Sequence, residues 1–374
     1  MAPGDVTFET FERVEEFDSL AREWDTLVRA MKRPTPFLLH GWIRAWLRHC
    51  TRGAKTAIYV ARRNGRLAAA LPLVIHRRFG LRIARFVGDD HPFVDALLAS
   101  DEGPELVSAL ASYAAPSFDC AALLTISRES ALAQTCAEHL RLAPRVRAPA
   151  LDLAPDFEQT YRDKYSSKKR KIHMRHRRQL AKLGKLEFEL AKSPEELAPA
   201  LEHAFRLHAL RWRDRFDSSG FVTPTSASFH RDAARNLASD DVMRILTARV
   251  GGQPIAFAYY FVLSGRMFYY RTAFDPEFAA FSPGLLSLLA ALELATGEGV
   301  TTVELLGGVQ RFKMEIADRI EQLYVGVGFG NRIGGRSYAR ALAYSYRFRD
   351  RLASSSLAQR LYSGLRSFPT VERG

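Results

Sequence analysis

The sequence predicts an α/β (α+β) protein built from two similar halves, and three observations support this. The chain has 374 residues, 47% of them hydrophobic and 25% charged, which is typical of a globular protein with two domains. In each half, amphipathic helical stretches alternate with short apolar runs bounded by turn residues, as in mixed sheets flanked by helices. One strand–turn–strand sequence also recurs between the halves.

The first half contains the clearest hairpin signal. Asn64-Gly65 separates two apolar runs, and this dipeptide suits a two-residue turn with left-handed backbone. The two runs predict strands at 56–63 and 66–75. Further patterns predict helices at 14–31, 40–49 and 105–114 and strands at 81–88 and 120–126.

The second half has the same outline. Ser193, followed by Pro194 and two glutamates, predicts the start of a helix that reaches about residue 216. Gly251-Gly252 and Ser264-Gly265 predict the turns of an antiparallel meander. The remaining pattern predicts strands at 243–250, 254–263, 266–274 and 302–306 and a helix at 283–297.

The two halves match at a constant offset. Residues 61–69 align with residues 248–256, with alanine, arginine, glycine and alanine at equal spacing inside the same strand–turn–strand context. Hairpins are common, so chance is one explanation. A duplicated domain is the interpretation that we prefer, and it fits the chain length.

The net charge of +13 is concentrated in two segments. Residues 161–185 hold 11 basic and 1 acidic residue, and residues 331–374 hold 9 basic and 2 acidic residues. The rest is close to neutral, so we expect no DNA partner, because a DNA-coating protein spreads positive charge over its folded faces. Residues 168–178 suit an exposed inter-domain helix, or contact with tRNA, a polyanionic glycan or an anionic membrane surface. The tail, as an amphipathic helix, suits a membrane surface or a partner domain.

Several features predict the compartment. The cysteines Cys50, Cys120 and Cys136 are odd in number and lack a C-x-x-C pair, which fits a reducing cytoplasm. The sequence contains no run of about 18 uncharged apolar residues that would predict a membrane-spanning helix. Residues 1–13 lack the basic-then-apolar order that is typical of a secretory signal. We therefore expect a cytoplasmic protein, or one peripheral to the inner membrane face. No paired ligand spacing such as H-x-x-x-H is present, so we expect no metal.

An ordered set of short motifs in the second half resembles a known family. The motifs are His208-x-x-Arg211-Trp212, Gly252-x-Pro254-Ile255-Ala256, Tyr269-Tyr270, Ala273-Phe274-Asp275-Pro276, Phe281-Ser282-Pro283-Gly284, Leu306-Gly307-Gly308 and Phe312-Lys313. Together they resemble the GNAT-like acyltransferases of the CelD/BcsL type, which have a BioF-like acetyltransferase domain and are relatives of the FemABX peptidyltransferases. The resemblance extends over about residues 37–330.

The resemblance implies two tandem GNAT-like (acyl-CoA N-acyltransferase) domains. We expect a degenerate N-terminal domain at 1–160, a basic connector helix at 161–185, an acyltransferase domain at 186–330 and a basic amphipathic tail at 331–374. The first domain has two aspartates in the loop 88–92, where a phosphate would lie. We therefore expect this domain to shape the acceptor cleft.

In such domains, acyl-CoA (acetyl-CoA) is the co-substrate and lies between two splayed strands. The resemblance places the thioester beside strand 266–274, where a free backbone N–H can polarise its carbonyl. It places the pyrophosphate at the start of the next helix, where N–H groups lack intrahelical partners. The residues expected to contact the cofactor are Tyr269, Tyr270, Phe281, Ser282, Pro283 and Gly284.

The catalytic candidates are Lys313, Arg211 and Asp275. Lys313 follows a strand end and a Gly-Gly turn, where ligands collect in open α/β sheets, and could bind a phosphate or carboxylate. Arg211 could hold an anionic acceptor, and Asp275 or Glu304 could accept a proton from the attacking amine. Each also has an ordinary explanation as a surface or capping residue. The substrate-binding candidates are His208, Trp212, Arg271 and Gly308.

The predicted function is transfer of an acyl group from acyl-CoA to an amine. By resemblance, the acceptor is a small molecule or a glycan- or lipid-linked amine, such as an amino sugar or a precursor of an envelope polysaccharide. One departure matters: the phosphate loop supplies only Gly284, with Phe278 and Phe281 where the family usually has Q/R-x-x-G-x-G/A. This leaves open aminoacyl transfer from tRNA, as in the FemABX relatives, and a non-catalytic binding protein of a polysaccharide assembly complex.

Overall fold

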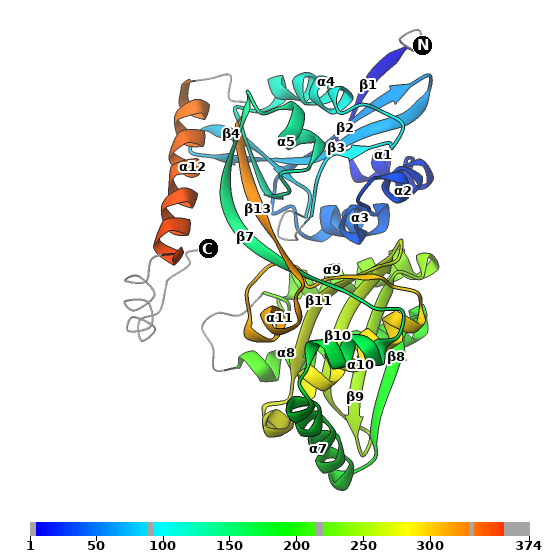
Figure 1. The fold of residues 1–374 in the computed structure, drawn as a ribbon. Helices are drawn as coiled ribbons and strands as arrows, with labels where there is room; N and C mark the ends of the chain where they lie inside the picture. The colour runs from blue at the N-terminus through cyan, green and yellow to red at the C-terminus, as the bar shows by residue number, and fades with distance from the viewer. Residues whose placement is uncertain (1–4, 89–92, 214–219, 329–332, 355–374) are drawn as a thin grey trace. The chain divides into compact units, whose positions relative to one another are not determined.

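The computed structural model describes residues 5–88, 93–213, 220–328 and 333–354 of the chain. It divides into two compact units, each assembled from separate stretches of sequence (Figure 1). The first unit comprises Met1–Arg13, Gly53–Val146 and Gln322–Gly374, and the second comprises Val14–Arg52 and Arg147–Glu321. Both units contain a mixed sheet with helices, which confirms the predicted α/β (α+β) class.

The described strands of the first unit have the order β1-β2-β3-β4-β6-β13. Strands β1 to β4 are antiparallel neighbours, whereas β6 runs parallel to β4 after a crossover through α4. The last part of β13, from the second half of the sequence, pairs antiparallel with β6. The elements of this unit are β1 (Val6–Phe11), β2 (Lys55–Arg63), β3 (Arg66–Arg78), β4 (Leu81–Phe86), β5 (Leu97–Leu98), α4 (Glu105–Ala114), β6 (Cys120–Ile126), α5 (Ala131–Thr135), the first part of β7 (Leu140–Asp152), the last part of β13 (Arg319–Gly328) and α12 (Ile333–Ser354).

The second unit repeats this strand order as β8-β9-β10-β11-β12-β7. Strands β8 to β11 are antiparallel neighbours, β12 runs parallel to β11 after α10, and the end of β7 pairs antiparallel with β12. The elements of this unit, besides the end of β7, are α1 (Val14–Asp18), α2 (Ala21–Ala30), α3 (His40–His49), α6 (Phe157–Lys164), α7 (Ser167–Leu183), β8 (Leu186–Ala191), α8 (Pro194–Trp212), α9 (Pro224–Leu237), β9 (Met243–Val250), β10 (Gln253–Leu263), β11 (Arg266–Phe274), α10 (Pro283–Gly297), β12 (Thr302–Glu304) and α11 (Arg311–Ile316).

The matched hairpins have the same turn in both units. Asn64-Gly65 has φ values of 51° and 79°, and Gly251-Gly252 has φ values of 56° and 82°. Two consecutive left-handed residues form the turn that best suits the twist of a hairpin. Each hairpin also contains a register irregularity shortly after the turn.

One arginine per hairpin makes the same contacts. Arg62 donates Nη1 to the carbonyl of the second turn residue at 3.0 Å, and Arg249 does the same at 3.0 Å. Arg62 also forms an ion pair with Glu9 of β1, and Arg249 forms one with Glu189 of β8. The duplicated arrangement therefore extends from the turn to the adjacent edge strand.

Many of the predicted segments have the observed bounds, including 40–49, 105–114, 120–126, 243–250, 266–274 and 283–297. The predicted helix 14–31 is two helices, α1 and α2, and strand 302–306 ends at Glu304, because Leu306 has a left-handed φ of 60°. The helix after Ser193 starts as predicted, with a capping box between Ser193 and Glu196, and ends at Trp212. Residues 214–219 lie outside the described part of the chain.

The helical part of the C-terminal tail packs on the first unit. Ala339 and Ala343 of α12 lie in one cluster with Val325 and Val327 of β13, so one face of the amphipathic helix is covered. Residues 355–374 lie outside the described part of the chain. Among the described residues, no helix is both long enough and apolar enough to cross a membrane.

Candidate active site

Strands β11 and β12 of the second unit diverge after a short pairing. Arg266 to Phe268 pair with Thr302 to Glu304, but β11 continues to Phe274 while remaining paired with β10 on its other side. A bulge opposite Tyr259 and Tyr260 places an extra residue, Tyr270, in β11. The stretch beyond Phe268 is therefore an open strand edge inside a sheet, which we call the diverging edge.

Arg271 lies on the diverging edge in an aromatic setting. Its guanidinium is 5.0 Å from the ring centroid of Tyr270 and 5.8 Å from that of Phe221. Its Nε is buried and has no hydrogen-bond partner in the described structure, and no described carboxylate forms an ion pair with it. Burial, and secondarily the Arg271 charge, lowers the pKa of His208 to about 4, so this histidine is neutral at pH 7.

Lys313 is a second cation beside Arg271. It is the third residue of α11, is 8% exposed, and donates Nζ to the carbonyl of Gly307 at 3.0 Å. Burial, and secondarily the charge of Arg271, lowers its pKa to about 8. No described carboxylate forms an ion pair with Lys313. The adjacent Gly308 adopts a φ of 109°, and its N–H bonds to the carbonyl of Arg147, which fixes the loop that carries the lysine.

The N-terminus of α10 lies against the opposite face of the same strand segment. A Cβ added at Gly284 would lie 3.1 Å from Cδ1 of Phe274 and 3.8 Å from Oγ1 of Thr272. Pro283 is buried at the first helical position, and the first turn contains no acidic residue. Arg211 of α8 lies over the Phe274 ring, 4.5 Å from its centroid. The predicted Gly284 and Arg211 therefore both meet Phe274.

Ser282, one of the residues expected to contact the cofactor, stands at the N-cap position of α10. It adopts left-handed backbone with a φ of 51°, and its side chain makes no cap hydrogen bond. Its carbonyl instead accepts bonds from the N–H groups of Leu285 and Leu286. Asp275 has a capping role: its carboxylate accepts the N–H of Glu277 at 3.1 Å, which starts the short turn before α10.

Tyr269, Tyr270 and Phe281, which were all expected to contact the cofactor, lie in different surroundings. Tyr269 is buried under α10, in one cluster with Leu288 and Leu292, whereas Tyr270 packs on the opposite face against Phe37 and Trp42. The bulge in β11 is the reason, because it breaks simple alternation at this point. Phe281, with Phe278, packs in a cluster that contains Leu180 of α7.

Part of the aromatic setting was not predicted from the sequence. Phe221 and His230 join His208 in a chain of ring contacts, with centroid distances of 5.1 Å and 4.8 Å along the chain. Trp212 stacks on His208 at 5.9 Å. No local pattern marks Phe221 or His230, because the contacts of Phe221 with Arg271 and of His230 with Tyr270 arise from the packing of α8 and α9 on the sheet.

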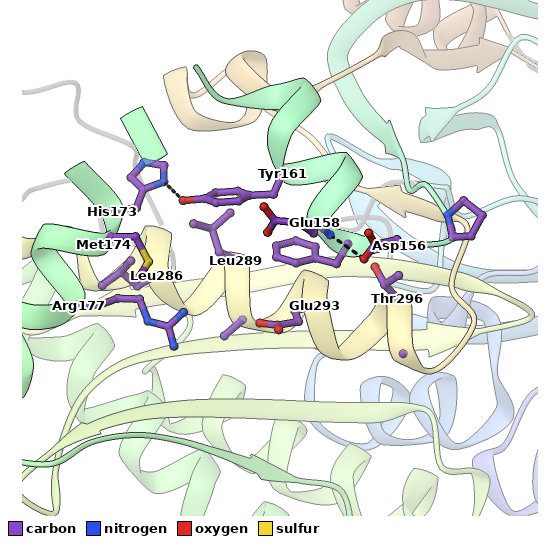
Figure 2. Close-up of a pocket in the computed structure, with 14 residues that line it drawn as sticks. Asp156, Glu158, Tyr161, His173, Met174, Arg177, Leu286, Leu289, Glu293 and Thr296 are labelled. Carbon is purple, nitrogen blue, oxygen red and sulfur yellow. Dashed lines mark hydrogen bonds between the residues drawn. The ribbon is translucent and has the colours of Figure 1, made fainter. Parts of the chain in front are cut away.

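A separate cavity of about 480 Å³ lies between α6, α7 and α10 (Figure 2). Its apolar wall includes Met174, Leu286 and Leu289, and its polar groups include Arg177 and Glu293. At one end, the Tyr161 hydroxyl and Nδ1 of His173 are hydrogen-bonded at 3.0 Å, as the figure shows. None of the residues that sequence analysis selected for the site lines this cavity.

Comparisons with known proteins agree with this architecture. Residues 167–314 match the family model of the acetyltransferase (GNAT) domain. No curated protein matches the sequence. Among solved structures, FemX aligns with a TM-score of 0.63 and 11% identity over 90% of this chain and 100% of its own.

Two further structures are similar. The C-terminal DUF2156 domain of an Agrobacterium fabrum protein described as a lysylphosphatidylglycerol synthetase aligns with a TM-score of 0.56 and 15% identity, over 87% of this chain and 95% of its own. A tandem GNAT protein from the clavulanic acid biosynthesis pathway aligns with a TM-score of 0.49 and 14% identity, over 88% and 100%. The matched GNAT domain lies in the second unit, and the first unit repeats its strand order, so the chain has a GNAT-type acyltransferase fold in two similar units.

Proposed function

We propose that the second unit is an N-acyltransferase of the CelD/BcsL type, which transfers an acyl group, in the simplest case acetyl, from acyl-CoA to an amine. The observation that carries the proposal is the pair of cations at the diverging edge, Arg271 and Lys313, which no described carboxylate neutralises. Cations kept close together without acidic partners suit an anionic substrate.

The diverging edge suits a thioester. Beyond Phe268, β11 has no pairing with β12, so a backbone N–H there can donate to the donor carbonyl oxygen. The acceptor amine attacks the carbonyl carbon and forms the C–N bond. The C–S bond breaks, and the departing CoA thiolate takes up the proton that the amine loses. Since no described cysteine lies at this edge, we propose direct attack without a covalent enzyme intermediate.

Arg271 and Lys313 would hold the anionic group of a substrate, either a donor phosphate or an acceptor phosphate or carboxylate. A bound anion would raise the pKa of Lys313 from about 8, so that the side chain is fully charged in the complex. The acid-free first turn of α10 adds partial positive charge on the other face of β11. We further propose, from the family resemblance, a cytoplasmic reaction on an amino sugar or an envelope polysaccharide precursor.

Calorimetric titration with acetyl-CoA and longer acyl-CoAs tests the donor. We expect saturable binding to the wild type and much weaker binding to Arg271→Leu and Lys313→Met. Release of the CoA thiol upon addition of an amino sugar then tests transfer. Absence of binding to any acyl-CoA would contradict the proposal, and binding without thiol release with any amine would favour the non-catalytic alternative.

A specific surface favours aminoacyl-tRNA as the second candidate donor. Helix α7 presents exposed cations at positions i, i+3, i+7, i+10 and i+14, opposite the buried His173 and Leu180. This row extends over about 21 Å along the helix axis. No described carboxylate pairs with any of its members, which are Lys168, Lys171, Arg175, Arg178 and Lys182.

Such a row suits a polyanion, and its affinity should depend steeply on salt. Within the same helix, Lys169 pairs with Glu315, and Arg170 donates to the carbonyl of Tyr165, so these two cations are already engaged. We therefore expect replacement of Lys168, Lys171 and Arg175 by Gln to weaken tRNA binding and flatten its salt dependence. A Gln at position 169 should have less effect. If the affinity for tRNA does not depend on salt, the cations of α7 do not bind the tRNA and the helix has a structural role only.

A further inference from the structure

One turn of the first unit contains a residue that the fold does not explain. Strands β3 and β4 are joined by Phe79-Gly80, with φ values of 53° and 74°. A bulky side chain is disfavoured in left-handed backbone, where Asn or Gly is usual. The matching turn of the second unit is Ser264-Gly265, with φ values of 49° and 71°. Phe79 is also 79% exposed, so little packing offsets the strain.

The chain around this turn is basic and has further exposed apolar surface. Arg77 and Arg78 are exposed, and the Arg78 guanidinium lies 5.0 Å from the centroid of the Phe79 ring. Helix α12 begins next to the turn, because a Cβ added at Gly334 would lie 3.4 Å from Cδ2 of Leu81. The first residue of α12, Ile333, is 84% exposed.

The outer face of α12 continues the same chemistry. Tyr344 is 70% exposed and Phe348 is 52% exposed, and their rings are stacked with centroids 6.4 Å apart. Arg340 is exposed one turn before Tyr344, and residues 333–348 contain no Asp or Glu. The opposite face of the helix is covered by the sheet of the first unit. Figure 1 shows α12, in orange and red, as a single long helix.

We propose that these residues bind the surface of an anionic lipid bilayer. We call them the aromatic–arginine face: Arg77, Arg78, Phe79, Ile333, Arg340, Tyr344 and Phe348. The arginines pair with lipid phosphates, while the aromatic and aliphatic side chains enter the boundary between headgroups and acyl chains. A peripheral surface of this kind explains why a strained turn presents phenylalanine to solvent.

The aliphatic and aromatic content favours a bilayer over a nucleic acid. A phosphate backbone is held by cations and hydrogen-bond donors, and Ile333 supplies neither. The charge is also complementary to anionic lipid, because the described part of this face carries cations and no carboxylate. The row on α7 differs, since its members are all cationic.

Phe79→Asn tests the proposal without harm to the fold. Asn suits the left-handed turn, so stability should be unchanged or higher. We expect the wild type to sediment with vesicles of phosphatidylcholine containing phosphatidylglycerol, but not with phosphatidylcholine alone. Phe79→Asn should weaken this binding about tenfold, since one aromatic side chain no longer leaves water. Phe79→Trp should retain binding and show a blue-shifted emission in the presence of the vesicles.

Two further variants sharpen the test. Tyr344→Ser with Phe348→Ser should also weaken binding to the anionic vesicles, whereas Leu183→Ser, which removes an exposed apolar side chain of α7, should not. Equal binding of wild type and Phe79→Asn would overturn the proposal. So would binding to tRNA in the absence of any binding to the anionic vesicles.

Discussion

The two units follow the same chain path but differ in charge where their strands diverge. In each, a parallel fifth strand joins the meander after a helix, and the strand beyond it comes from the other half of the sequence. Neither half of the sequence therefore completes its own sheet. The shared hairpin turns and their arginines show that this likeness extends to side chains.

The features of an anion site are present in the second unit and replaced in the first. The last residue of β4 is the buried Phe86 where β11 holds Arg271, and the third residue of α5 is Ala133 where α11 has Lys313. Helix α4 begins with Glu105, whereas the first turn of α10 has no acid. The fold thus persists without the charges, and the charges distinguish the unit that we propose binds the donor.

Removing both cations should have the largest effect. Each charged hydrogen bond to a ligand contributes about 1.5–3 kcal/mol, so Arg271→Leu with Lys313→Met should weaken acyl-CoA binding by about 3–6 kcal/mol. Calorimetric titration measures this loss, which exceeds about 100-fold in affinity. Arg249→Leu is the matched control, because it removes a cation at the hairpin turn of the same sheet. If the double variant binds acyl-CoA as tightly as the wild type, the two cations do not distinguish the donor-binding unit from the other one.

Much of the fold was predictable from local pattern, but the geometry of the site was only partly so. The hairpins, α10 and β11 follow from turn residues and apolar periodicity, and their bounds were found. The edge strands β1 and β8 were missed because they are only partly buried and their pattern is weak. Strand β7 pairs with β12 and strand β13 pairs with β6, and no local pattern predicts pairing between strands so far apart in the sequence.

The site residues show the same limit. Arg271 and Lys313 were both named as candidates from the sequence, but their proximity comes from the packing of α11 beside β11. Tyr269 and Tyr270 were both expected to contact the cofactor, and a single bulge separates them onto opposite faces. The pKa of Lys313 depends on burial, which the sequence around it does not reveal.

The next largest effect concerns the dependence of stability on pH. Burial lowers the pKa of Lys313 from 10.5 to about 8 in the folded state. Between these values the unfolded chain binds the proton and the folded chain does not, so the free energy of unfolding should rise with pH across this window. The contribution is about 2–3 kcal/mol. Urea unfolding of the wild type and of Lys313→Met at pH 7.5 and 10 measures this contribution. The free energy of unfolding should increase between these pH values more in the wild type than in Lys313→Met. An equal pH dependence of the two proteins would contradict the lowered pKa of a buried lysine.

A smaller effect is expected at the start of α10. Gly284→Ala places a methyl group 3.1 Å from the Phe274 ring, which must shift by a few tenths of an ångström. We expect weaker acyl-CoA binding by about 1–2 kcal/mol with little change in stability, since the ring is only half-buried. Gly297→Ala, at the other end of the same helix, meets no atom within 4 Å and is the control. If Gly284→Ala and the bulkier Gly284→Val both bind acyl-CoA as tightly as the wild type, the start of α10 is not part of the donor site. The description of the fold would be unaffected.

The smallest expected effect tests the likeness itself. Arg62 and Arg249 each bond a turn carbonyl at 3.0 Å and pair with a glutamate on the neighbouring strand. Because the partners are partly solvated, Arg62→Met and Arg249→Met should each cost only about 0.5–1 kcal/mol of unfolding free energy. Hydrogen exchange of the amides in β2 and β3, compared with those in β9 and β10, measures the two losses separately. If the hairpins are equivalent, the two losses of unfolding free energy agree within a few tenths of a kcal/mol. A loss confined to one hairpin would mean that the same contacts contribute differently to stability in the two units. In that case the two units would share only the path of the chain. The first unit could then no longer serve as the reference for the charged residues at the diverging edge of the second.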